Sequence, residues 1–158
     1  MKPPRIDHIG IVVDELEPAI TAMARMLPGA PLHRRSLPEA GLEVAEFHAE
    51  NLIVELLRYT DGGDGFGREV MGSAAGVNHL SLSVTDLDAA LAQLRAGGLE
   101  PLAGFPRRGA HGRIAFLPRD AVTGLRFELC QPDGEAHEGE EPEGGVPDGK
   151  ASGAERSS

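Results

Sequence analysis

The chain contains an internal repeat, and this repeat constrains the possible folds more than any other feature. The segment 7–20, DHIGIVVDELEPAI, aligns with the segment 78–91, NHLSLSVTDLDAAL, so that His8 and His79 occupy equivalent positions 71 residues apart. Both segments begin with alternating apolar residues, which is the pattern of a β-strand, and continue into a sequence typical of a helix. The repeat therefore predicts two equivalent strand–helix units, each with a histidine in its strand.

A second pair of segments repeats at almost the same spacing. The segment 52–58, LIVELLR, aligns with the segment 125–131, LRFELCQ, and this places Glu55 opposite Glu128 at an offset of 73. Each segment predicts a strand whose glutamate lies on the face opposite its Leu, Val and Phe residues. Because the offsets of the two pairs nearly agree, we interpret them as parts of one duplicated unit.

Each unit is predicted to have the order β-α-β-β-β, and the two units together form a single α+β fold. In the first unit Asp14 is a candidate helix cap, and the helix is expected to end near Leu27. In the second unit Thr85 or Asp86 is the candidate cap, and the helix is expected to run to about Arg95, where two glycines follow. The other expected strands span residues 31–36, 42–48, 99–105 and 112–117.

The domain organisation follows from the repeat and from the composition of the C-terminal end. We expect the first module at residues 1–60, a linker at 61–76 and the second module at 77–131. Residues 132–158 form an acidic tail, and eight Asp or Glu residues stand against two Lys or Arg within 133–158. This tail has almost no large apolar residue, so it cannot bury enough surface to offset its ordering entropy. We therefore predict that the tail is disordered.

If the two modules pack about a pseudo-twofold axis, their curved sheets enclose a cleft in which the repeated polar residues meet. A carboxylate on an apolar strand is unfavourable unless it is paired or binds a cation. Two imidazoles and two carboxylates suit one divalent ion, such as Co²⁺, Mn²⁺, Ni²⁺, Fe²⁺ or Zn²⁺, with two coordination positions left for water or substrate. The alternative is that each glutamate pairs with a nearby arginine. The four candidate metal ligands are His8, Glu55, His79 and Glu128.

The overall composition disfavours several classes of protein. The formal net charge is −10 and aromatic residues make up only 4% of the chain, which together argue against binding to nucleic acid. No apolar run is long enough to span a membrane, and we expect no secretory signal. The single cysteine, Cys130, cannot form an internal disulfide, which fits a reducing cytosol. We expect a cytoplasmic protein without a membrane or nucleic-acid partner, and a homodimer is compatible with the sequence.

The duplicated modules with this His and Glu pattern resemble the vicinal oxygen chelate superfamily. This superfamily includes glyoxalase I, extradiol dioxygenases, bleomycin-resistance proteins and methylmalonyl-CoA epimerases, and the resemblance covers about residues 5–131. Within it, several segments are most similar to the epimerases, namely DHIGIVV, LPEAGLEVA, VNHLSLSVTDLDAAL, PRRGAHGRIAFL and TGLRFEL. The turn Gly109-Ala110-His111-Gly112 matches a Gly-x-x-Gly turn that the epimerases carry before their penultimate strand.

The resemblance implies a function for the cleft. The metal ligands of the superfamily fall on the same four repeated residues, with one divalent ion per site. An acyl-CoA substrate carries phosphates, so positive side chains are expected at the rim of the cleft. The candidate substrate-binding residues are Arg107, Arg108, His111 and Arg113.

Epimerisation at C2 of an acyl thioester also needs an acid or base on each face of that carbon. Glu128 could act on one face by loosening from the metal. Bacterial epimerases often place a catalytic acid where this chain has Val44, and the nearby candidates here are Glu43 and Glu46. Glu46 shares a strand face with Val44, whereas Glu43 does so only if a bulge intervenes.

The function expected from these features is metal-dependent epimerisation, an isomerase activity, at C2 of methylmalonyl-CoA or a related acyl-CoA through a metal-stabilised enolate. A glyoxalase I-type lactoylglutathione lyase uses the same ligand set and is the first alternative. A non-catalytic protein that binds a small molecule or an antibiotic in the cleft is the second. A ring-cleaving dioxygenase is less compatible, because the fourth ligand, Glu55, would obstruct a position needed for substrate or oxygen.

Overall fold

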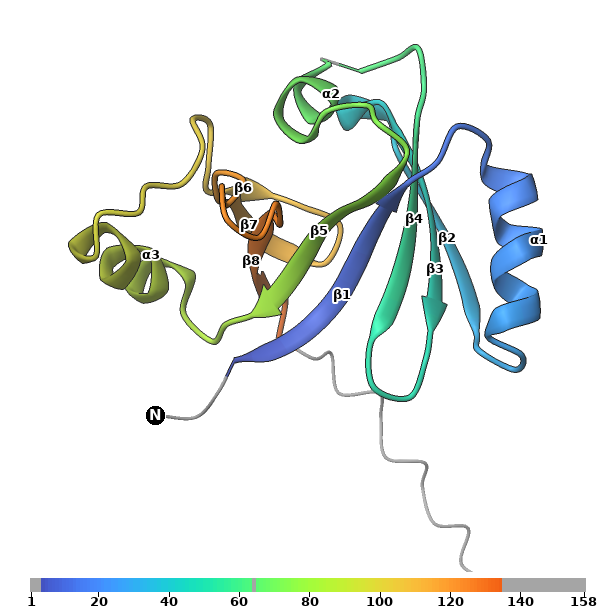
Figure 1. Cartoon of the computed structure of the whole chain (residues 1–158), viewed down its shortest axis with the longest axis horizontal. Helices are drawn as coiled ribbons and strands as arrows, with labels where there is room; N and C mark the ends of the chain where they lie inside the picture. Colours follow the sequence, from blue (N-terminus) through green and yellow to red (C-terminus); the bar gives the residue numbers. More distant parts are fainter. Residues whose placement is uncertain (1–3, 64, 135–158) are drawn as a thin grey trace, which may run out of the picture.

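The computed structural model describes residues 4–63 and 65–134. These residues form one curved eight-stranded sheet with helices packed around it (Figure 1). The strand order is β2-β3-β4-β1-β5-β8-β7-β6. The elements in chain order are β1 (Arg5–Val12), α1 (Leu16–Met26), β2 (Leu32–Leu37), a 3₁₀ turn (Pro38–Ala40), β3 (Leu42–His48), β4 (Ile53–Tyr59), α2 (Phe66–Met71), β5 (Gly76–Ser83), α3 (Leu87–Ala96), β6 (Arg107–Arg108), β7 (Gly112–Phe116) and β8 (Phe127–Pro132).

The arrangement of the strands reproduces the sequence repeat. β1 and β5 run antiparallel at the centre of the sheet, and each has a parallel neighbour on its other side, β4 beside β1 and β8 beside β5. The next strands outward, β3 and β7, pair antiparallel with β4 and β8. In Figure 1 the two halves of the sheet curve around a common space, with α1 and α3 outside it. The predicted α+β fold with a curved sheet is therefore confirmed.

Alternation along the strands separates an inner face of the sheet from an outer face. On β1, His8, Gly10 and Val12 are buried on the inner face, while Ile11 packs on the outer face beneath α1. Because the two long helices, α1 and α3, cover the outer face, the inner face is left to build a cavity. The apolar clusters are Leu16, Ile20, Ala45, Phe47 and Leu56 beneath α1, Leu87, Leu91, Ala115 and Leu129 beneath α3, and Val12, Leu42, Val44, Leu57, Met71 and Phe116 on the inner face.

The two long helices begin differently, although they occupy equivalent places in the repeat. Asp86 caps α3 as expected, since its Oδ1 accepts a hydrogen bond from the backbone N–H of Ala89 at 2.9 Å. In α1 the cap position is Glu15, whose side chain makes no capping bond. The prediction that Asp14 caps α1 is therefore wrong, because Asp14 lies one residue outside the cap. Within the described residues, no helix is long and apolar enough to cross a membrane.

The prediction of a strand at residues 99–105 is also wrong. Pro101 has no N–H to donate, and Gly104 has a left-handed φ of +86°, so this stretch cannot continue a regular ladder. Leu102 still donates a backbone hydrogen bond to the carbonyl of Phe116 at 2.8 Å, which fixes the stretch against β7. The strand that pairs with β7 is β6, which is only two residues long.

Two boundaries of the predicted organisation also differ from the structure. The stretch 61–76, expected to be a linker, contains the helix α2 and the first residue of β5. β8 reaches Pro132, and Asp133 forms an ion pair with Arg108, so the folded part extends past the predicted start of the tail. The disorder predicted for residues 135–158 lies outside the described residues.

Candidate active site

Four polar side chains from four neighbouring strands meet on the inner face of the sheet. Nε2 of His8 on β1 lies 3.2 Å from Nε2 of His79 on β5. The same atom lies 3.7 Å from Oε2 of Glu55 on β4 and 3.6 Å from Oε1 of Glu128 on β8. Nε2 of His79 also lies 3.9 Å from Oε2 of Glu55. The structure thus brings together the four residues that the repeat singled out.

The register of the central strands explains this convergence. Gly10 on β1 pairs with Glu55 on β4 and with His79 on β5, so both side chains flank a position that has none of its own. A Cβ at Gly10 would lie 2.1 Å from Cε1 of His79. Only glycine therefore allows the imidazole to lie across the central strand.

Each histidine is oriented by the residue before it in the chain. Nδ1 of His8 lies 3.0 Å from Oδ2 of Asp7, and Nδ1 of His79 lies 3.2 Å from Oδ1 of Asn78. Asn78 is itself fixed, because its Nδ2 donates a hydrogen bond to the carbonyl of Met71 at 2.8 Å. With Nδ1–H donated to these oxygens, each ring presents the lone pair of Nε2 to the centre of the cluster.

All four side chains are buried, with at most 5% of each residue exposed. Burial raises the pKa of Glu128 to about 7 and also raises the pKa of Glu55. Burial, helped by the charge of His8, lowers the pKa of His79 to about 3. Burial acts to lower the pKa of His8 as well, but the hydrogen bond to Asp7 and the two glutamates outweigh it and raise this pKa to about 9. Burial thus disfavours the charged forms of both glutamates, and a bound cation would stabilise them as carboxylates.

The donor atoms fit a divalent cation. Ligand bonds of about 2.1 Å in an octahedral shell place neighbouring donors about 3.0 Å apart and opposite donors about 4.2 Å apart. The four separations measured here, from 3.2 to 3.9 Å, lie within that span. His8, Glu55 and His79 offer atoms that all lie within 4.8 Å of one another. Glu128 lies 3.6 Å from His8 but is not part of that group of three. Imidazole and carboxylate donors of this kind suit first-row divalent ions.

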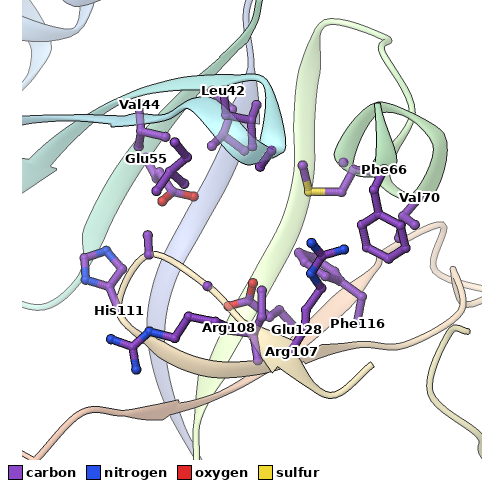
Figure 2. A pocket seen from close by; sticks show the side chains of 18 of the residues that line it. Leu42, Val44, Glu55, Phe66, Val70, Arg107, Arg108, His111, Phe116 and Glu128 are labelled. Atoms are coloured by element: carbon purple, nitrogen blue, oxygen red, sulfur yellow. The ribbon is translucent and has the colours of Figure 1, made fainter. Parts of the chain in front are cut away.

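The cluster opens into a cavity of about 560 Å³. Figure 2 shows Glu55 and Glu128 entering it from opposite sides, with His111 near the polar end. α2 covers the other end, where Phe66 and Val70 face the cavity. A cavity of this size and mixed character is typical of a small-molecule site. Its apolar wall includes Leu42, Val44, Leu57, Met71, Phe105 and Phe116.

A second polar cluster lies beside the first. Nε2 of His111 is 2.8 Å from Oε1 of Glu46. The two atoms form an ion-pair contact, but its geometry does not meet the criteria for a hydrogen bond. Glu46 is fully buried, and Arg35 and His48 contact its oxygens at 3.1 Å and 3.2 Å. Burial acts to raise the pKa of Glu46, but these partners, His111 foremost, outweigh it and lower the pKa to about 2. Glu46 is thus a carboxylate behind the cavity wall, whereas His111 lines the cavity itself.

Two predicted site residues are not brought to the cavity. β3 pairs with β4 without a bulge, so Glu43 stays on the outer face and forms an ion pair with Arg58 at 2.9 Å. Arg113 on β7 also points outward, where it pairs with Asp88 of α3 at 3.0 Å. Strand alternation therefore corrects the assignment of proton transfer to Glu43 and of substrate binding to Arg113.

Arg107 and Arg108 do line the mouth of the cavity, as Figure 2 shows. The guanidinium of Arg107 lies 4.0 Å from the centroid of the Phe66 ring, a cation–π contact that joins β6 to α2. Arg108 donates to Asp133 at 2.6 Å. Both side chains therefore bring positive charge to the mouth of the cavity.

Sequence reasoning did not identify the residues that orient the histidines or close the cavity. Asp7 and Asn78 precede the two histidines at equivalent positions of the repeat, and that equivalence was a usable signal. Phe66 and Met71 lie in the stretch interpreted as a linker. Glycines in and around α2 lower its helix propensity, so the sequence carried little signal for it.

Comparison with known proteins places the chain in a family. A family profile described as the Glyoxalase/Bleomycin resistance protein/Dioxygenase superfamily matches residues 7–116. The chain belongs to this superfamily. The curved sheet and the cluster of histidines and glutamates agree with the vicinal oxygen chelate resemblance of the sequence.

Individual relatives include epimerases. The chain is 32% identical over 133 residues to the ethylmalonyl-CoA/methylmalonyl-CoA epimerase of Cereibacter sphaeroides. This alignment covers 80% of this chain and 97% of that protein. It is 30% identical over 134 residues to the uncharacterized protein YqjC of Bacillus subtilis, with 84% and 96% covered. A solved methylmalonyl-CoA epimerase in complex with methylmalonyl-CoA and NH4+ matches at 30% identity with a TM-score of 0.64, covering 84% of this chain and 97% of that one.

Proposed function

We propose that the chain is a divalent-metal-dependent epimerase that acts at C2 of methylmalonyl-CoA or a closely related acyl-CoA. The observation that carries the proposal is the set of four buried donor side chains, repeated between the two modules, that opens into a cavity of acyl-group size. Two of the relatives described above are named as epimerases of such substrates, which supports it. The cytoplasmic location and the homodimer stay predictions.

Removing the C2 proton of an acyl thioester requires that the negative charge of the enolate be stabilised. When bound by the four donor side chains, a divalent cation supplies Lewis acidity at the thioester carbonyl. Asp7 and Asn78 hold the two imidazoles in place, so the donor atoms need no reorganisation during the reaction. The apolar wall excludes water from the reacting carbon and strengthens the electrostatic interactions around it.

Glu128 is the candidate for proton transfer on one face of C2. Ser81 donates a hydrogen bond to its Oε1 at 2.7 Å, which fixes that oxygen and leaves Oε2 to exchange a proton with the substrate. Cys130 lies on the same strand and lines the same cavity, but burial raises the pKa of its thiol to about 12. Cys130 is therefore not a nucleophile or a base at neutral pH.

The test is deuterium exchange at C2 of methylmalonyl-CoA in heavy water, with the Co²⁺-loaded protein. The proposal expects exchange and interconversion of the two epimers. Glu128→Gln should lower the rate by at least about a hundredfold, the usual contribution of a general acid or base. Cys130→Ala should retain the rate of the wild type.

A glyoxalase assay with the glutathione adduct of methylglyoxal is run beside it. Turnover of that adduct without exchange at C2 would assign the chain to the lactoylglutathione lyases. Binding of small molecules without turnover in either assay would make it a non-catalytic binding protein.

A further inference from the structure

We infer that His111 is the acid/base group on the face of C2 away from Glu128, and that Glu46 is the residue that positions it. The inference rests on the proposed epimerase function and names its second proton-transfer group. Inversion at C2 needs a proton removed from one face and a proton delivered to the other. The resemblance to bacterial epimerases implies a catalytic acid at position 44. This chain instead has Val44 there, whose apolar side chain is buried in the cavity wall and cannot transfer a proton.

The cavity wall contains few alternatives for this role. Within the described part of the chain, the other ionisable side chains of the wall, apart from the predicted metal ligands, are Glu39, Arg107, Arg108 and Cys130. Glu39 is exposed in the 3₁₀ turn, the two arginines carry guanidinium groups, and burial raises the pKa of the Cys130 thiol. His111 is the imidazole of the wall that is not among the four predicted metal ligands. It enters the cavity at a different place from Glu128, as Figure 2 shows.

The turn that carries His111 is anchored on both sides. The backbone N–H of Gly109 donates to the carbonyl of Gly112 at 2.8 Å, and the carbonyl of His111 accepts from the N–H of Asp133 at 2.9 Å. The centroid of the His111 ring lies 6.0 Å from that of His8, close enough for both to face one small substrate. A ring nitrogen of His111 and carboxylate oxygens of Glu46 and Glu55 all lie within 4.8 Å of one another, so the ring is held directly beside the predicted metal ligands.

Glu46 has the features of a positioning residue. It is fully buried behind the wall, and its Oε1 lies 2.8 Å from Nε2 of His111. Arg35 and His48 contact the same carboxylate, so its charge is stabilised without a contribution from substrate. This contact favours a proton on Nε2 and so leaves the lone pair of the neutral imidazole at Nδ1. An aspartate orients the histidine of hydrolase triads by the same principle, with the two ring nitrogens exchanged.

The proton balance is simple. In one direction Nδ1 of neutral His111 takes the C2 proton, the electron pair of the C–H bond passes into the enolate, and Glu128 in its acid form delivers a proton to the opposite face. In the reverse direction Glu128 removes the proton and the His111 imidazolium returns one. Each turnover therefore exchanges the protonation states of the two groups, and solvent restores them.

The experiment follows exchange in heavy water from each epimer of methylmalonyl-CoA separately, with the Co²⁺-loaded full chain. His111→Gln should lower exchange from one epimer by at least about a hundredfold, while exchange from the other epimer, whose proton Glu128 removes, falls by less than about tenfold. Glu46→Gln should lower exchange from the same epimer selectively. Glu43→Gln is the matched control, since Glu43 lies on the outer face of the same strand, where it pairs with Arg58, and both epimers should exchange as in the wild type.

The selectivity between epimers separates the possible outcomes. A purely structural role for His111 or Glu46 would lower both exchange rates together, and this result would overturn the inference, as would unchanged rates in His111→Gln. Addition of imidazole to His111→Ala should restore exchange from the affected epimer only. If the wild type itself exchanges neither epimer, the proposed function fails, and the inference fails with it.

Discussion

Gly10 and His79 contact each other across the central strand pair of the sheet, because a Cβ on Gly10 would lie 2.1 Å from the imidazole. The ring occupies the space that any side chain at position 10 would need. Gly10 also pairs in register with Glu55, so a second predicted ligand depends on the same backbone position. Gly10, although it has no functional side chain, is therefore required for the donor atoms to converge.

Gly10→Ala should accordingly damage the metal site. The methyl group must push the His79 ring aside, which should weaken Co²⁺ binding at least tenfold and lower the free energy of unfolding by about 1–3 kcal/mol. Calorimetric titration with Co²⁺ and thermal denaturation measure the two effects. Gly62→Ala is the control, since its Cβ would have only Thr60 Oγ1 nearby, at 3.7 Å. Metal binding by Gly10→Ala as tight as in the wild type would contradict this assignment.

The carboxylate of Asp7 should matter for metal binding although it is not a predicted ligand. Asp7→Asn keeps the size of the side chain but removes the charge that holds Nδ1–H of His8, and affinity for Co²⁺ should fall by about 10–100-fold. Asp88→Asn, which changes an exposed aspartate paired with Arg113, should leave the affinity unchanged. Equal affinities of the two variants would show that Asp7 does not orient the imidazole.

The pH dependence of stability should reveal the buried Glu46 carboxylate. Its pKa is lowered from 4.5 to about 2, so its contribution is present above pH 4.5 and is lost as the pH falls toward 2. A shift of this size corresponds to about 3 kcal/mol. The difference in unfolding free energy between the wild type and Glu46→Gln, measured by urea denaturation, should therefore be largest near pH 6 and shrink between pH 4.5 and pH 3. Glu43→Gln, on the outer face of the same strand, should change stability by less than about 1 kcal/mol.

Of the three arginines predicted at the rim, Arg107 and Arg113 should differ in their effect on substrate binding. Arg107→Ala removes a cation at the mouth of the cavity, and the KM for an acyl-CoA should rise about tenfold with little change in kcat. Arg113→Ala should leave both constants unchanged, because its guanidinium faces α3. A larger effect at Arg113 than at Arg107 would mean that the substrate approaches from the outer face.

The convergence of the predicted ligands could be anticipated from the sequence because duplication and strand parity act together. His8 and His79, and likewise Glu55 and Glu128, keep the same parity on equivalent strands, so one curved sheet must bring them to the same face. The same parity already favoured Glu46 over Glu43, and the regular β3–β4 register agrees. The alternation of residues along a strand was therefore enough to predict the face of the sheet on which each of these side chains lies.

The rest of the site depends on contacts between distant segments, which periodicity does not encode. α2 is short and glycine-flanked, and it is a helix over the cavity because Phe66 and Met71 find apolar partners there. The pairing of His111 with Glu46 joins a turn of one module to a strand of the other. The position equivalent to Glu46 in the second module is Phe116, since each pairs with the strand glutamate of its module, so no comparison between the modules could have revealed the contact.

The most direct measurement is a titration of the metal-free protein with Co²⁺, during which the interconversion of the two epimers of methylmalonyl-CoA is followed at each addition. If His8, Glu55, His79 and Glu128 form one essential metal site, the rate should rise linearly and stop rising at one equivalent of Co²⁺ per chain. His79→Ala should show no such break. A metal-free chain that interconverts the epimers at the full rate, or a loaded chain that never does, would contradict the metal-dependent epimerase.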